Sequence, residues 1–193
     1  IINLLLPHSI SSIFLFFMDE KTDTGDVLDF EPIKIESRDN IQTSFFKVDK
    51  SSIKMLKRTL PKIKSGKFIR KTQDNSKATR FYKRKPSDGL IDFSWDGNKI
   101  LNYIRALTFP YPGAFFKYNS NYLINIWKAS WGKNDYCDYK IGEILEIKYG
   151  KGIRIKVGEN NSIWIELISD KNGLECWADD WVKENNLSEG DIL

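Results

Sequence analysis

Acidic side chains are concentrated in the stretch from Met18 to Asp26, where Asp19, Glu20, Asp23 and Asp26 fall within eight residues. Carboxylates crowded in one loop raise one another's pKa, and a carboxylate with a raised pKa can act as a general base near neutrality. The same composition is also typical of an ordinary acidic turn, in which Asp and Thr side chains bond to the backbone. From the residues alone, both interpretations stay open.

Other catalytic chemistries find no support in the sequence. It contains no G-x-G-x-x-G, Walker, G-x-S-x-G or zinc signature. The single histidine is His8, so a nucleophile has no histidine partner elsewhere in the sequence. Cys137 and Cys176 are far apart and have no C-x-x-C partner, so we predict no metal site and no disulfide framework. This cysteine usage favours a reducing cytoplasm, and no apolar run approaches the roughly 20 residues that a spanning helix needs.

The elements that would position the acidic loop can be predicted from apolar patterns. Apolar runs at 13–18 and 27–30 flank the loop, which predicts strand, loop and strand. From Ile41 to Ile63, apolar residues recur at intervals of three to five, which is helical spacing. Because residues 49–52 offer a fresh N-cap, the pattern predicts two helices, with Pro61 ending or kinking the second.

A basic, turn-rich stretch follows. From Lys47 to Lys85 there are 15 Lys or Arg residues against two Asp, a local net charge of +13 in a chain whose net charge is +4. Such a block can be a solvated helix face, or it can attract the phosphates of a nucleotide or an RNA. Turn formers between residues 66 and 89 predict a boundary between two packed units.

The remaining residues predict a small β domain. Asp96 or Gly97 can cap a helix that carries Ile100 and Ile104. Alternating segments at 123–129, 143–149, 153–157 and 162–168 predict strands joined by short turns, so an OB-like antiparallel barrel is the economical fold. A helix over 177–185 and a closing strand over 190–193 complete it. The six Trp residues are interpreted as core and edge fillers.

Several stretches together resemble the folate-dependent formyltransferase family. Residues 16–28 are similar to its loop pattern M-D-E-G-x-D-T-G-D, and residues 84–95, 104–108 and 110–115 are similar to the segment before its C-terminal domain. Shorter similarities continue to Leu193. The resemblance implies an α+β or α/β remnant of a catalytic domain at 1–68, a basic linker at 69–89 and an OB-like C-terminal domain at 90–193.

The resemblance also implies an activity, which is transfer of a formyl group from 10-formyltetrahydrofolate to a primary amine. Asp23 matches the family's catalytic Asp and Asn3 its catalytic Asn, whereas Leu5 stands where the family has His. The matching loop implies that the cofactor contacts Met18, Asp19, Glu20, Thr24 and Gly25. Only 15 residues separate Pro7 from Asp23, too few for the helix and strand that the family has there.

We therefore expect residue 1 to be a cut and the chain to be impaired in catalysis by itself. The expected acceptor is the amine of a nucleotide-linked amino sugar. Two alternatives remain: methionyl-tRNA as the acceptor, and a non-catalytic OB-type binding module. The sequence sets no oligomeric state.

Overall fold

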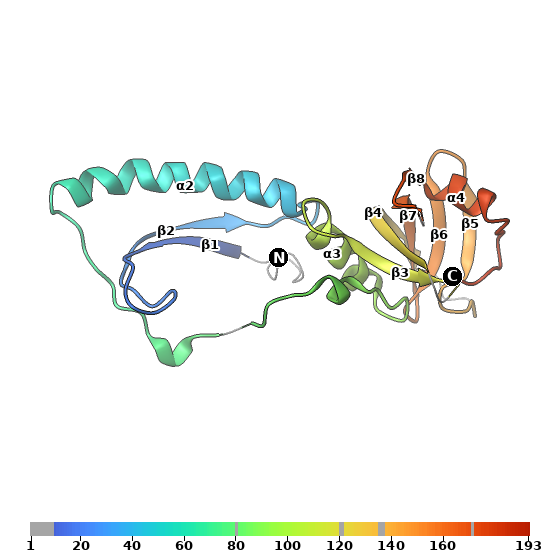
Figure 1. The fold of residues 1–193 in the computed structure, drawn as a ribbon, viewed down its shortest axis with the longest axis horizontal. Helices are drawn as coiled ribbons and strands as arrows, with labels where there is room; N and C mark the ends of the chain where they lie inside the picture. Colours follow the sequence, from blue (N-terminus) through green and yellow to red (C-terminus); the bar gives the residue numbers. More distant parts are fainter. Residues whose placement is uncertain (1–9, 80, 120–121, 135–137, 171) are drawn as a thin grey trace. The chain divides into compact units, whose positions relative to one another are not determined.

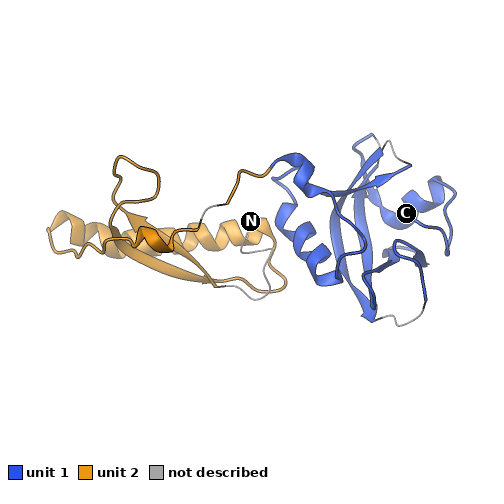
Figure 2. Cartoon of the chain, turned by 90° about the horizontal axis from the view of Figure 1, so that it is seen from below, with its two compact units in different colours: residues 1–6, 85–193 blue, residues 7–84 orange. Residues whose placement is uncertain are grey.

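The computed structural model describes residues 10–79, 81–119, 122–134, 138–170 and 172–193. The chain forms two compact units (Figure 2), which we name the hairpin unit, residues 7–84, and the sheet unit, residues 85–193 with 1–6. The division into remnant, linker and C-terminal domain at 68 and 89 stays a prediction. In the described part of the chain, no helix has the length and apolarity needed to cross a membrane.

The hairpin unit is an antiparallel β-hairpin with a long helix on one face. Strands β1 (Ile10–Phe16) and β2 (Val27–Lys34) run antiparallel, with Phe14 opposite Phe30 and Leu15 opposite Asp29. Helix α2 (Ile41–Lys64) lies along them (Figure 1). The strand, loop and strand predicted from the apolar runs are confirmed.

Helix α2 is continuous, so the prediction of two helices is wrong. Asn40 caps its start by accepting a hydrogen bond from the Thr43 N–H. The internal Asp49 cap is not used because the buried face continues past it to Met55 and Thr59, and this contact holds the backbone helical. Pro61 lies in the last turns, and the helix continues through it to Lys64.

The basic stretch after α2 returns to the hairpin. Lys71 and Val27 exchange both backbone hydrogen bonds, at 2.8 and 2.9 Å. Two 3₁₀ turns follow, η1 (Asn75–Lys77) and η2 (Pro86–Gly89). The first part of the predicted linker is therefore packed on the hairpin unit.

In the sheet unit, one helix precedes a run of antiparallel strands in the chain and another follows it. Asp96 caps α3 (Gly97–Leu107), as predicted. The strands and last helix are β3 (Ala114–Tyr118), β4 (Tyr122–Asn134), β5 (Ile144–Lys148), β6 (Gly152–Val157), β7 (Asn161–Ser169), β8 (Glu175–Trp177) and α4 (Ala178–Glu184). The pairing order is β3-β4-β7-β6-β5, with β8 also on β7. The antiparallel β domain is confirmed.

Its details differ from the prediction in three places. Strands β3 and β8 were not predicted. The prediction of a closing strand over 190–193 is wrong, since Ile192 makes only an isolated bridge to Glu143. Among the described strands no pairing joins β3 to β5, so closure into an OB-like barrel stays a prediction.

Candidate active-site loop and family membership

The acidic loop between β1 and β2 is closed by backbone contacts. The Phe17 N–H donates to the Asp26 carbonyl at 3.0 Å. Gly25 is buried beneath this closure, and a Cβ there would lie 1.7 Å from the Phe17 carbonyl oxygen. Only glycine allows this approach. The loop therefore has a defined conformation that depends on its Gly.

Asp19 organises the first half of the loop. Its Oδ1 accepts from the Thr24 hydroxyl at 2.6 Å and from the Lys21 N–H at 3.0 Å. The Thr24 hydrogen bond, helped by the Lys21 N–H, lowers the pKa of Asp19. The interpretation that crowding raises the carboxylate pKa values is therefore wrong for Asp19, because hydrogen bonds to the charged form outweigh the repulsion.

Asp23 is presented at the tip of the loop. Its φ is 59°, in the left-handed region that Asp and Asn tolerate best among residues with a Cβ. The side chain is exposed, and within the described part of the chain no hydrogen bond or ion pair engages its carboxylate. Asp26 is half-buried and likewise has no side-chain partner there. Asp23 can thus meet a substrate without giving up an internal contact.

Gln73 braces the loop from the segment after α2, and sequence reasoning missed it. Its Nε2 donates to the carbonyls of Asp23, at 3.0 Å, and Gly25, at 2.7 Å. Nearby, the Arg70 guanidinium lies 4.0 Å from the centroid of the Phe17 ring. No local pattern could have signalled Gln73, because 48 residues separate it from Gly25.

The other site residues of the sequence prediction fall into two groups. Met18, 93% exposed, and the exposed Glu20 can contact a ligand, whereas Asp19 and Gly25 shape the loop. Asn3 lies outside the described residues. In the ranges that the structure describes, no group of three or more His, Cys, Asp or Glu residues could hold a metal ion.

A charge network fixes the hairpin beneath α2. The Arg58 guanidinium donates to both Asp29 oxygens, at 2.7 and 2.8 Å, and also to Glu31. Lys54 donates to Glu31, and the buried Thr59 hydroxyl to Asp29. Hydrogen bonds from Arg58 hold the pKa of Asp29 far below its usual range, and those from Lys54 and Arg58 lower the pKa of Glu31. The network orients β2 and hence the end of the loop.

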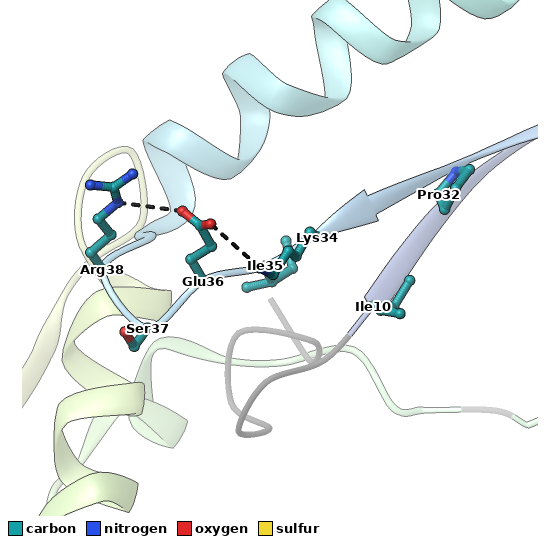
Figure 3. A pocket seen from close by; sticks show the side chains of 7 residues that line it. All are labelled: Ile10, Pro32, Lys34, Ile35, Glu36, Ser37 and Arg38. Atoms are coloured by element: carbon teal, nitrogen blue, oxygen red, sulfur yellow. Dashed lines mark ion pairs between the residues drawn. The ribbon is translucent and has the colours of Figure 1, made fainter.

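A separate pocket of about 720 Å³ lies at the far end of the hairpin. Figure 3 shows Glu36 between Arg38 and Lys34, with ion-pair distances of 3.4 and 3.8 Å. Its other lining residues are Ile10, Pro32, Ile35 and Ser37. The carboxylate in this pocket is already paired, and no described residue of the acidic loop lines it. We therefore keep the loop as the candidate site.

The family model named "Formyl transferase, C-terminal domain" matches residues 83–186, which cover most of the sheet unit. The chain belongs to this formyltransferase family. The bifunctional polymyxin resistance protein ArnA of Wigglesworthia glossinidia brevipalpis is 38% identical over 136 residues, which are 70% of this chain and 20% of ArnA. The methionyl-tRNA formyltransferase of Geobacillus sp. (strain WCH70) is 31% identical over 157 residues, 80% of this chain and 48% of that protein.

Solved structures share the fold of this formyltransferase chain. HypX from Aquifex aeolicus, solved with tetrahydrofolic acid, aligns with a TM-score of 0.69 at 18% identity, over 95% of this chain and 32% of HypX. An N-formyltransferase from Helicobacter canadensis aligns with a TM-score of 0.59 at 20% identity, over 81% of this chain and 55% of the other. The chain thus spans about half or less of the relatives that it matches.

Proposed function

We propose that this chain serves folate-dependent formyl transfer, from 10-formyltetrahydrofolate to the primary amine of a nucleotide-linked amino sugar. The observation that carries the proposal is the braced loop, which holds Asp23 in a left-handed conformation with no described partner for its carboxylate. In this reaction the amine nitrogen forms a bond to the formyl carbon and loses a proton, while the bond from that carbon to N10 of the folate breaks and N10 gains a proton, which leaves tetrahydrofolate. Asp23 is the residue that takes this proton.

The cofactor supplies the formyl group when bound, and the loop's own residues would help to hold it. Met18 and Glu20 have exposed side chains in the same loop as Asp23 and would contact the folate. Asp19 and Thr24 bond to each other and keep the loop in shape, while Gly25 lies under the loop closure. Gln73 holds the backbone carbonyls of Asp23 and Gly25 and thereby fixes the backbone position from which the Asp23 side chain extends.

One similarity favours an amino sugar as the acceptor. The Helicobacter canadensis structure contains folinic acid and dTDP-3-aminofucose. An amino sugar linked to a nucleoside diphosphate is therefore the acceptor class to test first.

The test places this chain in a complete catalytic setting. Residues 16–193 replace the corresponding C-terminal part of the Helicobacter canadensis enzyme, and formylation of dTDP-3-aminofucose is measured. We expect activity, and Asp23→Asn should lower kcat roughly 10²- to 10⁴-fold at unchanged folinic acid affinity. Asp26→Asn should lower kcat much less. Equal losses in both variants, with folinic acid still bound, would refute the role of Asp23.

The 193-residue chain by itself should give no measurable turnover with either acceptor, because Leu5 stands where the family has His. Turnover by the unmodified chain that Asp23→Ala abolishes would contradict this expectation.

Methionyl-tRNA is the second candidate acceptor, favoured by the basic surface of the hairpin unit. Lys50, Lys57, Lys62, Lys64 and Lys67 are exposed. They have no carboxylate partner among the described residues. Such lysines can neutralise phosphates, and the affinity would then fall steeply as salt rises. Filter binding of methionyl-tRNA between 50 and 200 mM salt, an interval over which such contacts weaken strongly, checks this. A flat salt dependence argues for the amino sugar.

A further inference from the structure

Helix α2 has a second apolar face besides the one on the hairpin. Ile41, Met55 and Thr59 are buried against β1 and β2. On a different face, four large apolar side chains are exposed, with exposed fractions of 70, 55, 37 and 54%. We name these residues the outer stripe: Phe46, Ile53, Leu56 and Leu60.

The outer stripe has the spacing of a helix-packing seam. Phe46, Ile53 and Leu60 are seven residues apart, and Leu56 follows Ile53 by three. Alternating steps of three and four place apolar side chains in one row on a helix. The row spans about 21 Å, at 1.5 Å per residue. Asp49 lies in the same row and separates Phe46 from the other three, which gives the seam a polar position.

One border of the outer stripe is cationic. Lys50, Lys57 and Lys64 repeat every seven residues; Lys50 and Lys57 each follow a row position by one residue, and Lys64 continues the repeat. All three side chains are exposed, and none has an ion-pair partner among the described residues. The opposite border, at Ser52 and Thr59, turns toward the hairpin and carries no charge. The charge on the stripe's free side is therefore positive along its length.

This charge pattern does not fit a second copy of the same helix. In an antiparallel pair, the positions of Lys50, Lys57 and Lys64 face the same positions of the other copy, so lysine meets lysine. In a parallel pair they face the positions of Ser52 and Thr59, which offer no carboxylate. Like charges along an apolar seam select against such pairing.

We propose that the outer stripe docks an amphipathic helix of a partner protein, and that the apolar seam of this helix is bordered by Asp or Glu. The apolar row would supply the buried contact, and the three lysines would pair with the partner's carboxylates and fix its orientation. This proposal does not depend on formyl transfer, because none of these residues belongs to the acidic loop.

Two designed peptides test the proposal with the full 193-residue chain. Both are 21-residue helices with Leu in the seam, and one has Glu and the other Lys at the bordering positions. Fluorescence anisotropy should give at least tenfold tighter binding of the Glu peptide at low salt. The triple variant Lys50→Glu, Lys57→Glu and Lys64→Glu should invert this preference. Equal binding of the two peptides would overturn the proposal.

A second pair of variants tests the apolar row. Leu56→Gln with Leu60→Gln should weaken binding of the Glu peptide at least tenfold, whereas Leu174→Gln, at a more exposed leucine in the sheet unit, should not. Far-UV circular dichroism checks that α2 stays folded in each variant. Sedimentation tests for self-association. If the unmodified chain is a dimer and the Leu56 and Leu60 changes dissociate it, the stripe pairs with a second copy and the proposal is wrong.

Discussion

In the sheet unit, buried side chains from α3, α4 and the strands form one apolar cluster, with isoleucines at its centre. Ile100, Ile126, Ile144, Ile155 and Ile165 are each fully buried. In the hairpin unit, the buried apolar residues are few in the described part of the chain, and they are Ile33, Ile35, Ile41 and Met55. Its helix is attached by this small apolar contact together with the charge network described above, from Asp29 and Glu31 to Lys54 and Arg58.

The sheet unit is better able than the hairpin unit to fold independently. A core of fully buried isoleucines contributes about 1.5–3 kcal/mol for each side chain. Half-exposed ion pairs contribute much less and weaken with salt and acid. A two-stranded hairpin is only marginally stable alone. The hairpin unit therefore depends on its helix and on what covers its exposed apolar groups.

The two units can be followed separately in solution. All six Trp residues lie in the sheet unit, so Trp fluorescence follows that unit: Trp95, Trp127, Trp131, Trp164, Trp177 and Trp181. Helix α2 has 24 residues, against 11 in α3 and 7 in α4. Far-UV circular dichroism at 222 nm, the wavelength of helix absorption, therefore follows mainly the hairpin unit.

A cavity in the sheet unit should lower stability more than any other change considered below. Ile165 is fully buried, so Ile165→Ala should lower the free energy of unfolding by about 2–5 kcal/mol. Ile53→Ala, at an exposed position on α2, should change it by less than about 0.5 kcal/mol. Urea titrations followed by Trp fluorescence and by circular dichroism measure both. A small loss in Ile165→Ala would mean that the sheet unit is not held by this core.

The next effect is removal of the network's central cation. Arg58→Met keeps much of the side-chain length but removes the cation that pairs with both Asp29 and Glu31. The thermal midpoint of the helix signal should fall by several degrees, and that of Trp fluorescence should not move. Lys54→Met is the matched control and should cost less, because Lys54 is more exposed than Arg58. An equal fall in the two signals would show that the units unfold together.

Acid should affect the hairpin unit first. Folding lowers the pKa of Asp29 through Arg58 and Thr59, and that of Glu31 through Lys54 and Arg58. A lowered carboxylate pKa stabilises the fold above the unfolded value of about 4 and loses that contribution as pH falls below it. As the pH falls below about 4, the helix signal should therefore weaken before the Trp signal does. Asp29→Asn should flatten this dependence, and an unchanged acid profile would contradict it.

Elements with a local apolar pattern could be predicted from the sequence, whereas contacts between distant residues could not. Alternating apolar residues and the turn formers between them predicted β4 to β7, although β6 proves to be buried on both faces, with Arg154 and Lys156 buried as well. The pattern predicted two helices in place of the continuous α2, because the Asp49 side chain can cap a helix. Whether it does so depends on the packing of Met55 and Thr59, which a local pattern does not reveal. Arg58 and Lys54 were counted in a solvated or phosphate-binding block, although they pair with Asp29 and Glu31 across more than 20 residues. Long-range pairing of this kind leaves no local pattern.

The smallest expected effect concerns the brace of the acidic loop, which belongs to the hairpin unit but not to its charge network. Gln73→Leu removes the two hydrogen bonds to the Asp23 and Gly25 carbonyls and leaves the loop closed only by its own contacts. Each such bond contributes about 0.5–1.5 kcal/mol. Amide hydrogen exchange in residues 19–26 should accelerate several-fold, while the helix and Trp signals stay unchanged.

The matched control is Gln42→Leu, at an exposed position in the first turn of α2. It should leave exchange in the loop as it is, because no hydrogen bond in the described part of the chain joins the Gln42 side chain to residues 19–26. In the chimeric enzyme, Gln73→Leu should lower kcat through misplacement of Asp23, since a carboxylate whose backbone moves loses the fixed position that proton transfer needs. Unchanged exchange together with unchanged kcat would mean that the loop is held by Asp19, Thr24 and Gly25 alone, and that Gln73 is not its brace.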